Sequence, residues 1–142
     1  MENRDGVIKL SDGAILKLKI TVIEARDIGF SPFEGVNIGV KAMGGIAVQE
    51  VPEAIIKGMT GKPLAPVGPE PPKDGWKIVE IIQCTPACVE EEVKTSRGPF
   101  IVRVQAEPVM ASANYNYRTE INEPVYWVNW VFKISWKPAE GK

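Results

Sequence analysis

Five residues in the C-terminal third of the chain have side chains that could hold a planar ligand. Tyr115, Tyr117, Arg118, Trp127 and Asn129 place aromatic rings, a cation and an amide on two neighbouring segments. Aromatic faces and guanidinium groups stack on bases and on sugars. The alternative is that most of these rings belong to the core, because each large aromatic side chain buries about 150 to 250 Å². The five residues are the candidate ligand- or partner-binding site of this sequence.

Trp127 is the most conspicuous member of this set. In an alternating strand it shares its face with Asn129, Lys133 and Ser135, which are polar. A mostly polar face that carries one tryptophan is also typical of a subunit interface. The first place to look for function is therefore the face that carries Trp127 and Asn129, and a second protein surface is the partner we expect there.

The two cysteines, Cys84 and Cys88, have a spacing that matches neither a redox motif nor half of a usual zinc site. If the chain turns back on itself after Cys84, the two residues face each other and could form a disulfide. If a helix begins there, both are small buried apolar residues. The sequence leaves both interpretations open.

The sequence lacks the residues that most catalytic mechanisms use. The chain has no histidine, which excludes Ser-His and Cys-His nucleophile pairs and removes the commonest metal ligand. The segment Gly58 to Lys62 has two residues between its glycines and Pro63 after its lysine, so it does not fit a phosphate-binding loop. Three successive glutamates, 90–92, indicate a solvated face, with a site for a hard cation as the alternative. We predict no catalytic residues, no metal site and no cofactor.

Charge and hydropathy restrict the partners further. Lys and Arg total 17 against 18 Asp and Glu, for a net charge of −1. Without a global positive field, nucleic-acid binding would require a local patch. No apolar run reaches the roughly 18 residues of a membrane helix, and residues 1–5 do not resemble a signal peptide. We expect a cytoplasmic protein without membrane contact, and the twelve prolines fit a thermophilic source.

The elements that must position these residues are mostly strands. Period-two alternation predicts strands over 14–24 and 36–42, with Gly44 and Gly45 breaking or bulging the second strand before it resumes at 46–51. Pro52 suits the first turn of a short helix that runs to about Lys57. Residues 60–75 hold five prolines and predict an extended loop, with a proline-rich ligand motif at Pro63, Pro66, Pro69 and Pro72 as the alternative.

The second half is expected to hold five more elements. Residues 76–84 are strongly apolar and predict a central strand buried on both faces. Thr85 and Pro86 then favour a helix to about residue 98, with a hairpin as the alternative. Three strands over 99–106, 109–118 and 125–136 are expected to form a meander. In the last of these, Tyr126, Val128, Trp130, Phe132, Ile134 and Trp136 form the expected core face.

These elements predict one β-rich domain over 1–142. Its architecture is mainly β, an antiparallel barrel or sandwich of about six to eight strands, with one or two short helices and a long proline-rich loop. We expect the long apolar strands to be covered by self-association. The favoured function is a non-catalytic binding or assembly module. The alternatives are a single-stranded nucleic-acid binder and a small-molecule enzyme with a Glu, Arg or Tyr site in a barrel mouth.

Overall fold

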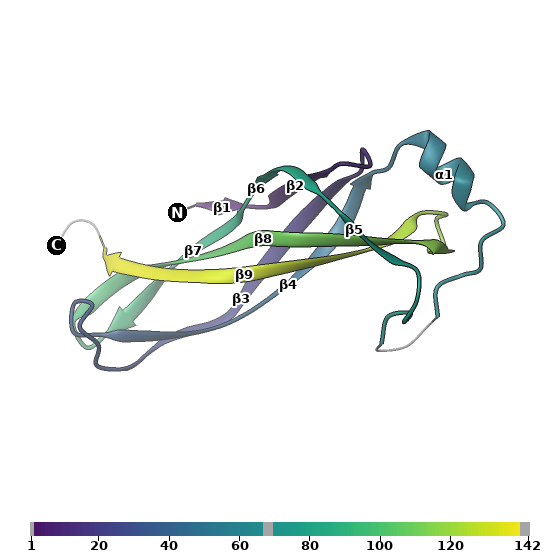
Figure 1. Cartoon of the computed structure of the whole chain (residues 1–142). Coiled ribbons are helices and arrows are strands. Elements are labelled where there is room, and N and C mark those ends of the chain that lie inside the picture. Colours follow the sequence, from purple (N-terminus) through teal and green to yellow (C-terminus); the bar gives the residue numbers. More distant parts are fainter. Residues whose placement is uncertain (1, 67–69, 140–142) are drawn as a thin grey trace.

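The alternation of apolar and polar residues produces two antiparallel sheets that pack face to face (Figure 1). This computed structural model describes residues 2–66 and 70–139, which contain nine strands and one helix. The elements are β1 (Asn3–Arg4), β2 (Gly6–Leu10), β3 (Ile15–Gly29), β4 (Asn37–Glu50), α1 (Glu53–Met59), β5 (Trp76–Val79), β6 (Ile81–Thr85), β7 (Ala87–Thr95), β8 (Gly98–Arg118) and β9 (Pro124–Pro138).

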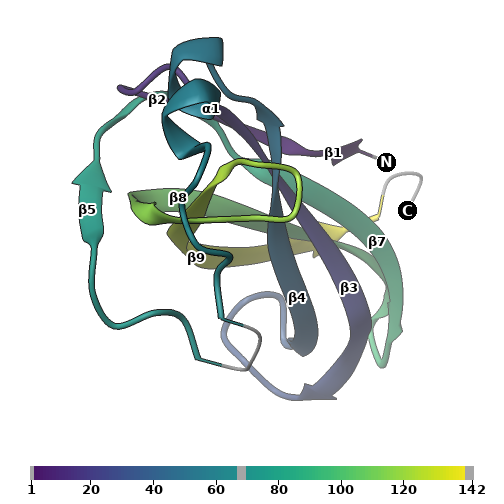
Figure 2. The ribbon, with the colours of Figure 1, turned by 90° about the vertical axis from the view of Figure 1, so that its right-hand side faces the viewer.

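The long strand β8 organises the first sheet. Its partner along one edge is β9, whereas β7 and β5 pair with successive parts of its other edge, and β1 extends the sheet beyond β7. The second sheet has the order β4-β3-β2-β6. The helix α1 and the turn between β8 and β9 lie at one end of the molecule, which faces the viewer in Figure 2. The β3–β4 and β7–β8 turns lie at the other, which we call the hairpin end.

The two long sides of the sandwich differ. On one side the chain itself joins the sheets, since β1 continues into β2 and the run β5-β6-β7 passes from the first sheet to the second and back. A Cβ on Gly6 would lie 2.8 Å from the backbone of Thr85 and of Ala87, so this crossing requires glycine. On the other side the sheets end at β4 and β9, where Trp130 packs against Gly44. We call this second side the open side.

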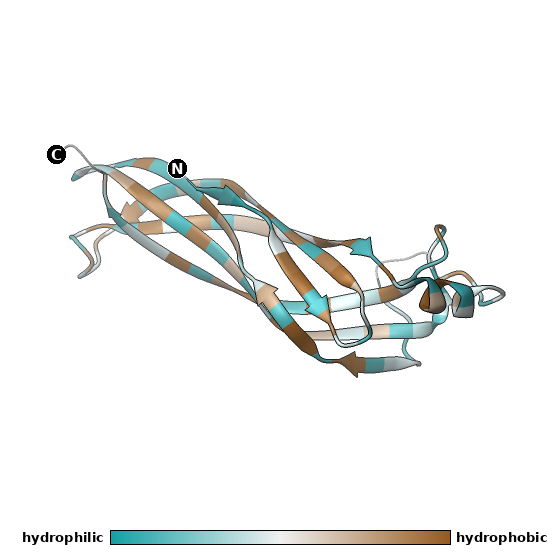
Figure 3. Cartoon of the chain, turned by 90° about the horizontal axis from the view of Figure 1, so that it is seen from above, coloured by the Kyte–Doolittle hydropathy of each residue, from teal (hydrophilic) through white to brown (hydrophobic). Residues whose placement is uncertain are grey.

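The core lies between the sheets in two clusters, and alternating bands of hydropathy mark the strands that form it (Figure 3). The smaller cluster, near the hairpin end, consists of Val36, Ile38, Val93, Phe100 and Val102. The larger cluster is Ile8, Leu10, Ala14, Leu16, Leu18, Val79, Ala87, Ala106, Ala111, Ala113, Tyr126 and Val128. Because both sheets contribute to the larger cluster, it holds the layers together.

The sequence-based expectations for the fold class and for several elements are confirmed. The fold is mainly β, and its two sheets form a sandwich-like arrangement. The strand expected over 14–24 is β3, and the short helix is α1, which Glu53 and Lys57 stabilise by an ion pair of 3.4 Å. In the described part of the proline-rich loop the one strand-like pairing is an isolated bridge between Leu64 and Arg118. Pro69, part of the ligand motif considered above, lies outside the described residues.

Three expectations about strands are wrong. Residues 76–84 do not form a buried central strand, because the chain changes sheets at Glu80 and each half lies at a sheet edge, which leaves Ile78 74% exposed. Gly44 and Gly45 do not interrupt β4, since Gly44 instead makes room for Trp130. Glu107 and Pro108 do not end a strand either, because a shift of register beside Pro108 absorbs the proline within β8.

The segment after Thr85 is neither a helix nor the second arm of a hairpin with residues 76–84. It is β7, which pairs with β8 from Ala87 to Thr95, while β6 pairs with β2. The Thr-Pro pair and the glutamate run are local helix signals, but the nine-residue pairing with β8 outweighs them. Pro86 marks the point where the chain leaves one sheet for the other.

Candidate functional site

Trp127 lies on the outer face of the first sheet, as its alternation with Tyr126 and Val128 predicts. Its side chain is 50% exposed, and it meets Trp76 of β5 edge-on with ring centroids 6.3 Å apart. The Trp76 indole donates a 2.5 Å hydrogen bond to the carbonyl of Pro72, which holds that ring in place. Pro71 and Ser112 complete a shallow apolar hollow of about 230 Å³ around the two rings.

Tyr115 points the other way, toward the β2–β3 turn. Its hydroxyl donates a 2.6 Å hydrogen bond to Oδ2 of Asp12, and Tyr126 donates a 2.8 Å bond to the same oxygen. Oδ1 of Asp12 accepts the backbone N–H of Ala14 at 2.9 Å. Burial raises the pKa of both tyrosines, and the Asp12 carboxylate raises it further. We call Asp12, Tyr115 and Tyr126 the Asp12 clamp, because it joins the second sheet's turn to β8 and β9 of the first.

Tyr117 and Arg118 contact the proline-rich loop at the end of the molecule that carries α1. The Tyr117 hydroxyl donates to Asp74 at 3.2 Å, and this bond raises the pKa of Tyr117. The Arg118 Nε donates to the carbonyl of Lys62 at 2.8 Å, and its backbone N–H donates to the carbonyl of Pro63 at 2.9 Å. These side chains therefore anchor the loop on both sides of residues 67–69.

The five residues predicted as one binding surface thus lie in three environments. Tyr115 faces the interior, Tyr117 and Arg118 contact the loop, and Trp127 and Asn129 lie exposed on β9. Ser112 stands opposite Trp127, so alternation along β8 places Tyr115 on the other face of the sheet. Of the predicted set, the structure brings together Trp127 with Asn129 on β9 and Tyr117 with Arg118 at the loop.

The strand β9 carries further exposed apolar residues beyond Trp127. Val131 is 47% exposed on the outer face, and Phe132 and Ile134, expected in the core, are 38% and 42% exposed on the inner face. Tyr126 and Val128 are buried as predicted. The expectation for Phe132 and Ile134 is wrong because β9 is the last strand of its sheet and no further strand shields them among the described residues. Alternation predicts the face of a residue, but it does not reveal whether its strand is an edge.

A second hollow lies beside the same strand at the hairpin end. It measures about 180 Å³ and is lined by Phe33, Ile134, Ser135 and Trp136. Phe33 and Trp136 contact each other edge-on, and the Trp136 indole donates a 3.2 Å hydrogen bond to the carbonyl of Phe33. Both this hollow and the one at Trp127 are smaller than the roughly 300 Å³ at which small-molecule pockets begin. Their volumes fit a contoured contact surface better than a pocket for a substrate.

Comparisons with family models, curated proteins and solved structures found no match to this chain. The function must therefore be argued from the site. Within residues 2–66 and 70–139, no three His, Cys, Asp or Glu side chains come together as metal ligands. The one described helix, α1, is far too short and polar to cross a membrane.

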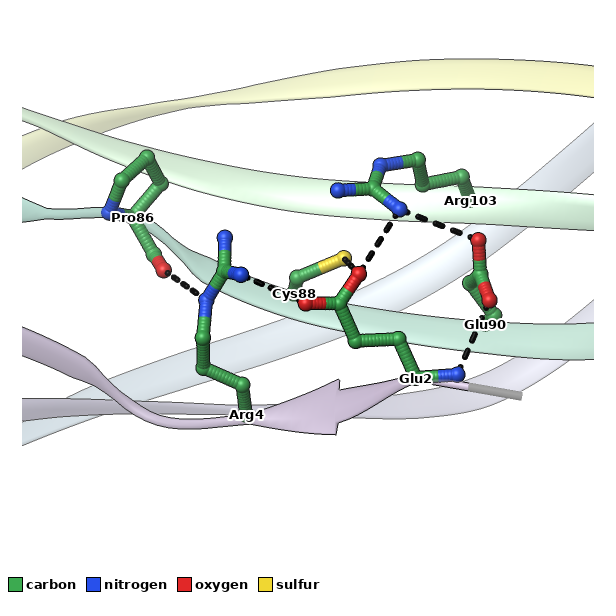
Figure 4. Close-up of polar contacts among 6 residues, drawn as sticks. All are labelled: Glu2, Arg4, Pro86, Cys88, Glu90 and Arg103. Atoms are coloured by element: carbon green, nitrogen blue, oxygen red, sulfur yellow. Dashed lines mark hydrogen bonds and ion pairs between the residues drawn. The ribbon is translucent and has the colours of Figure 1, made fainter.

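The densest group of charges lies on the outer face of the first sheet (Figure 4). Arg103 donates to Glu2 at 2.9 Å and to Glu90 at 3.0 Å. Arg4 donates to Glu2 at 2.5 Å and to the carbonyl of Pro86 at 3.2 Å. The backbone N–H of Glu2 and the Arg103 guanidinium lower the pKa of Glu90. Because every charge in this group has an opposite partner, the group attaches β1 to β7 and β8 without offering a free catalytic group.

Cys88 lies beneath this group, whereas Cys84 is exposed on β6, and both are free thiols. Burial raises the pKa of the Cys88 thiol and so suppresses its reactive thiolate.

We expect an aromatic disulfide reagent to modify one thiol per chain within minutes in the native state, and the second only after unfolding. The absorbance of the released thiolate measures this, with Cys84→Ser as the control that removes the fast phase. If both thiols reacted fast, or if neither reacted before reduction, the protein would not hold one accessible and one buried free thiol.

Proposed function

We propose that this chain is a non-catalytic assembly module that self-associates through its open side. The observation that supports the proposal is the unpaired edge of β9. Among the described residues this fifteen-residue strand pairs only with β8, so a row of backbone N–H and C=O groups along its other edge has no strand partner. An exposed strand edge of this length is a template for pairing with another chain.

The edge has only part of the usual protection against pairing. Proteins protect free edges with charged side chains, lysines above all, and with prolines or bulges. In β9 the prolines stand only at the two ends, as Pro124 and Pro138, and its charged residues are Lys133 and Lys137. Glu107 neutralises Lys133 through a 2.8 Å ion pair. The apolar residues Val131, Phe132 and Ile134 next to this edge support association over simple exposure to water.

The charged groups also support a role without catalysis. In the Asp12 clamp the carboxylate already accepts hydrogen bonds from two tyrosines and a backbone N–H. In the charged group around Arg103 each charge is paired with an opposite charge of the same group. Neither group leaves a base beside a nucleophile, which is the arrangement that hydrolytic and transfer reactions require.

Light scattering coupled to size exclusion tests the proposal directly. We expect the molar mass to approach at least twice the 15.6 kDa of one chain as the loading concentration rises, because association follows mass action. The increase should survive high salt, since the surface is mainly apolar. A mass equal to one chain at every concentration would refute self-association.

A further inference from the structure

We infer that two copies pair their β9 strands antiparallel about a two-fold axis at Val131, so that their first sheets join into one continuous sheet. This inference rests on the proposed function and makes it specific. Around such an axis the same residues contribute from both copies, and residues whose numbers sum to 262 stand opposite each other. The ends of β9, its charges and its exposed apolar residues all favour this register.

The ends of β9 favour this axis. Proline has no N–H to donate to a ladder, and β9 is bounded by Pro124 and Pro138. With the axis at Val131, each terminal proline stands opposite the other terminal proline of the partner strand. Every residue from 125 to 137 is then paired. Any other axis leaves part of this range beyond the end of the partner strand.

The charges favour this axis over those on its C-terminal side. An axis at Lys133 would set two ammonium groups directly opposite, and an axis at Phe132 would leave them on a diagonal about 7 to 8 Å apart. Like charges at these positions destabilise a strand pair. With the axis at Val131, Lys133 stands opposite Asn129 and Lys137 opposite Val125, so that no two charges of the same sign are neighbours in the ladder.

The exposed apolar residues acquire partners in this register. On the inner face Phe132 stands opposite Trp130, and Ile134 opposite Val128, which supplies the neighbouring strand that Phe132 and Ile134 lack in a single chain. On the outer face the two Val131 side chains meet at the axis. Aromatic and β-branched cross-strand pairs of this kind are the stabilising contacts of a sheet.

The edge is long enough for a specific contact. A fifteen-residue strand extends about 50 Å at roughly 3.4 Å per residue, and a sheet with its side chains is about 10 Å thick, the spacing of stacked sheets. The product is on the order of 500 Å² for each chain, or about 1,000 Å² in total, which reaches the size at which specific interfaces begin.

Disulfide trapping in the full chain tests the register. All variants carry Cys84→Ser, which removes the exposed native thiol. Residues directly opposite in antiparallel strands have Cα atoms about 4.5 to 5.5 Å apart, within the range of a disulfide. We expect Val131→Cys to form a covalent dimer by itself under mild oxidation. Asn129→Cys and Lys133→Cys should each remain uncrosslinked alone and should form a mixed dimer when combined.

Ile78→Cys is the matched control, because Ile78 is an apolar residue that is even more exposed than Val131 and lies on β5, which pairs with the other edge of β8. It should not crosslink. A chain that has the mass of a dimer but lacks the β9 pattern would overturn this inference and leave self-association standing. Crosslinking of Asn129→Cys with itself would also overturn it, since that result requires a different axis. A strict monomer would overturn both proposals.

Discussion

Replacing Asp12 by alanine should lower the free energy of unfolding by about 3 kcal/mol, because a hydrogen bond to a charged group contributes about 1.5 to 3 kcal/mol. One carboxylate accepts the hydroxyls of Tyr115 and Tyr126 and the backbone N–H of Ala14. Removing it leaves the Tyr126 hydroxyl without its acceptor where that side chain is 6% exposed. Urea titration followed by tryptophan fluorescence measures the loss.

Asp74→Ala is the matched control for this substitution. Asp74 also accepts a tyrosine hydroxyl, that of Tyr117, but the pair is exposed to water. We expect this change to cost less than about 0.5 kcal/mol, as is usual for surface sites. Equal losses for the two variants would show that the Asp12 clamp contributes no more than a surface hydrogen bond.

Alkaline pH provides a second measurement of the same clamp. The pKa values of Tyr115 and Tyr126 are raised in the folded protein, so the unfolded chain releases these protons first. Their contribution to stability is complete below about pH 10, the ordinary tyrosine pKa, and is lost as the pH rises above it. Tyr126→Phe should weaken this alkaline dependence. A stability that falls equally steeply in the variant would contradict the role of Tyr126.

The sequence predicted local structure well where one period dominated a segment. The mainly β fold, β3, α1 and β9 followed from alternation and from the position of Pro52, because both signals are local. The errors share a cause in long-range pairing. At Thr85 and Pro86 the helix signal competes with a hairpin across the turn at residues 96–97, which pairs Ala87 with Ala106, beyond the span of the helix signal.

The candidate site was predicted in part for the same reason. That Trp127 and Tyr126 lie on opposite faces of β9 follows from alternation, and the structure confirms it. Whether Tyr115 lies beside Trp127 depends on the register of β8 with β9, in which Ser112 stands opposite Trp127, and on Asp12, more than 100 residues away in the chain. Whether a strand lies at the edge of its sheet depends on the topology of the whole chain. The edge position of β9 leaves Phe132 exposed, and no pattern within β9 itself indicates that position.

The largest effect on assembly is expected from Val131→Glu. In the proposed dimer this substitution sets two carboxylates opposite each other at the axis and removes two buried valines, so each copy contributes to the loss. We expect the dissociation constant of the dimer to rise on the order of 100-fold, which corresponds to about 2.7 kcal/mol. Sedimentation velocity across a concentration series measures this change.

Ile78→Glu provides the comparison that separates the edge of β9 from general surface charge. Both substitutions place a glutamate on a solvent-facing strand position of the first sheet, where Ile78 is 74% and Val131 47% exposed, so both chains should fold with similar stability. Only the position on β9 lies in the proposed ladder. If Ile78→Glu dissociated the assembly and Val131→Glu did not, the contact would lie on the β5 side of the sheet, and β9 would be a free edge that the protein tolerates.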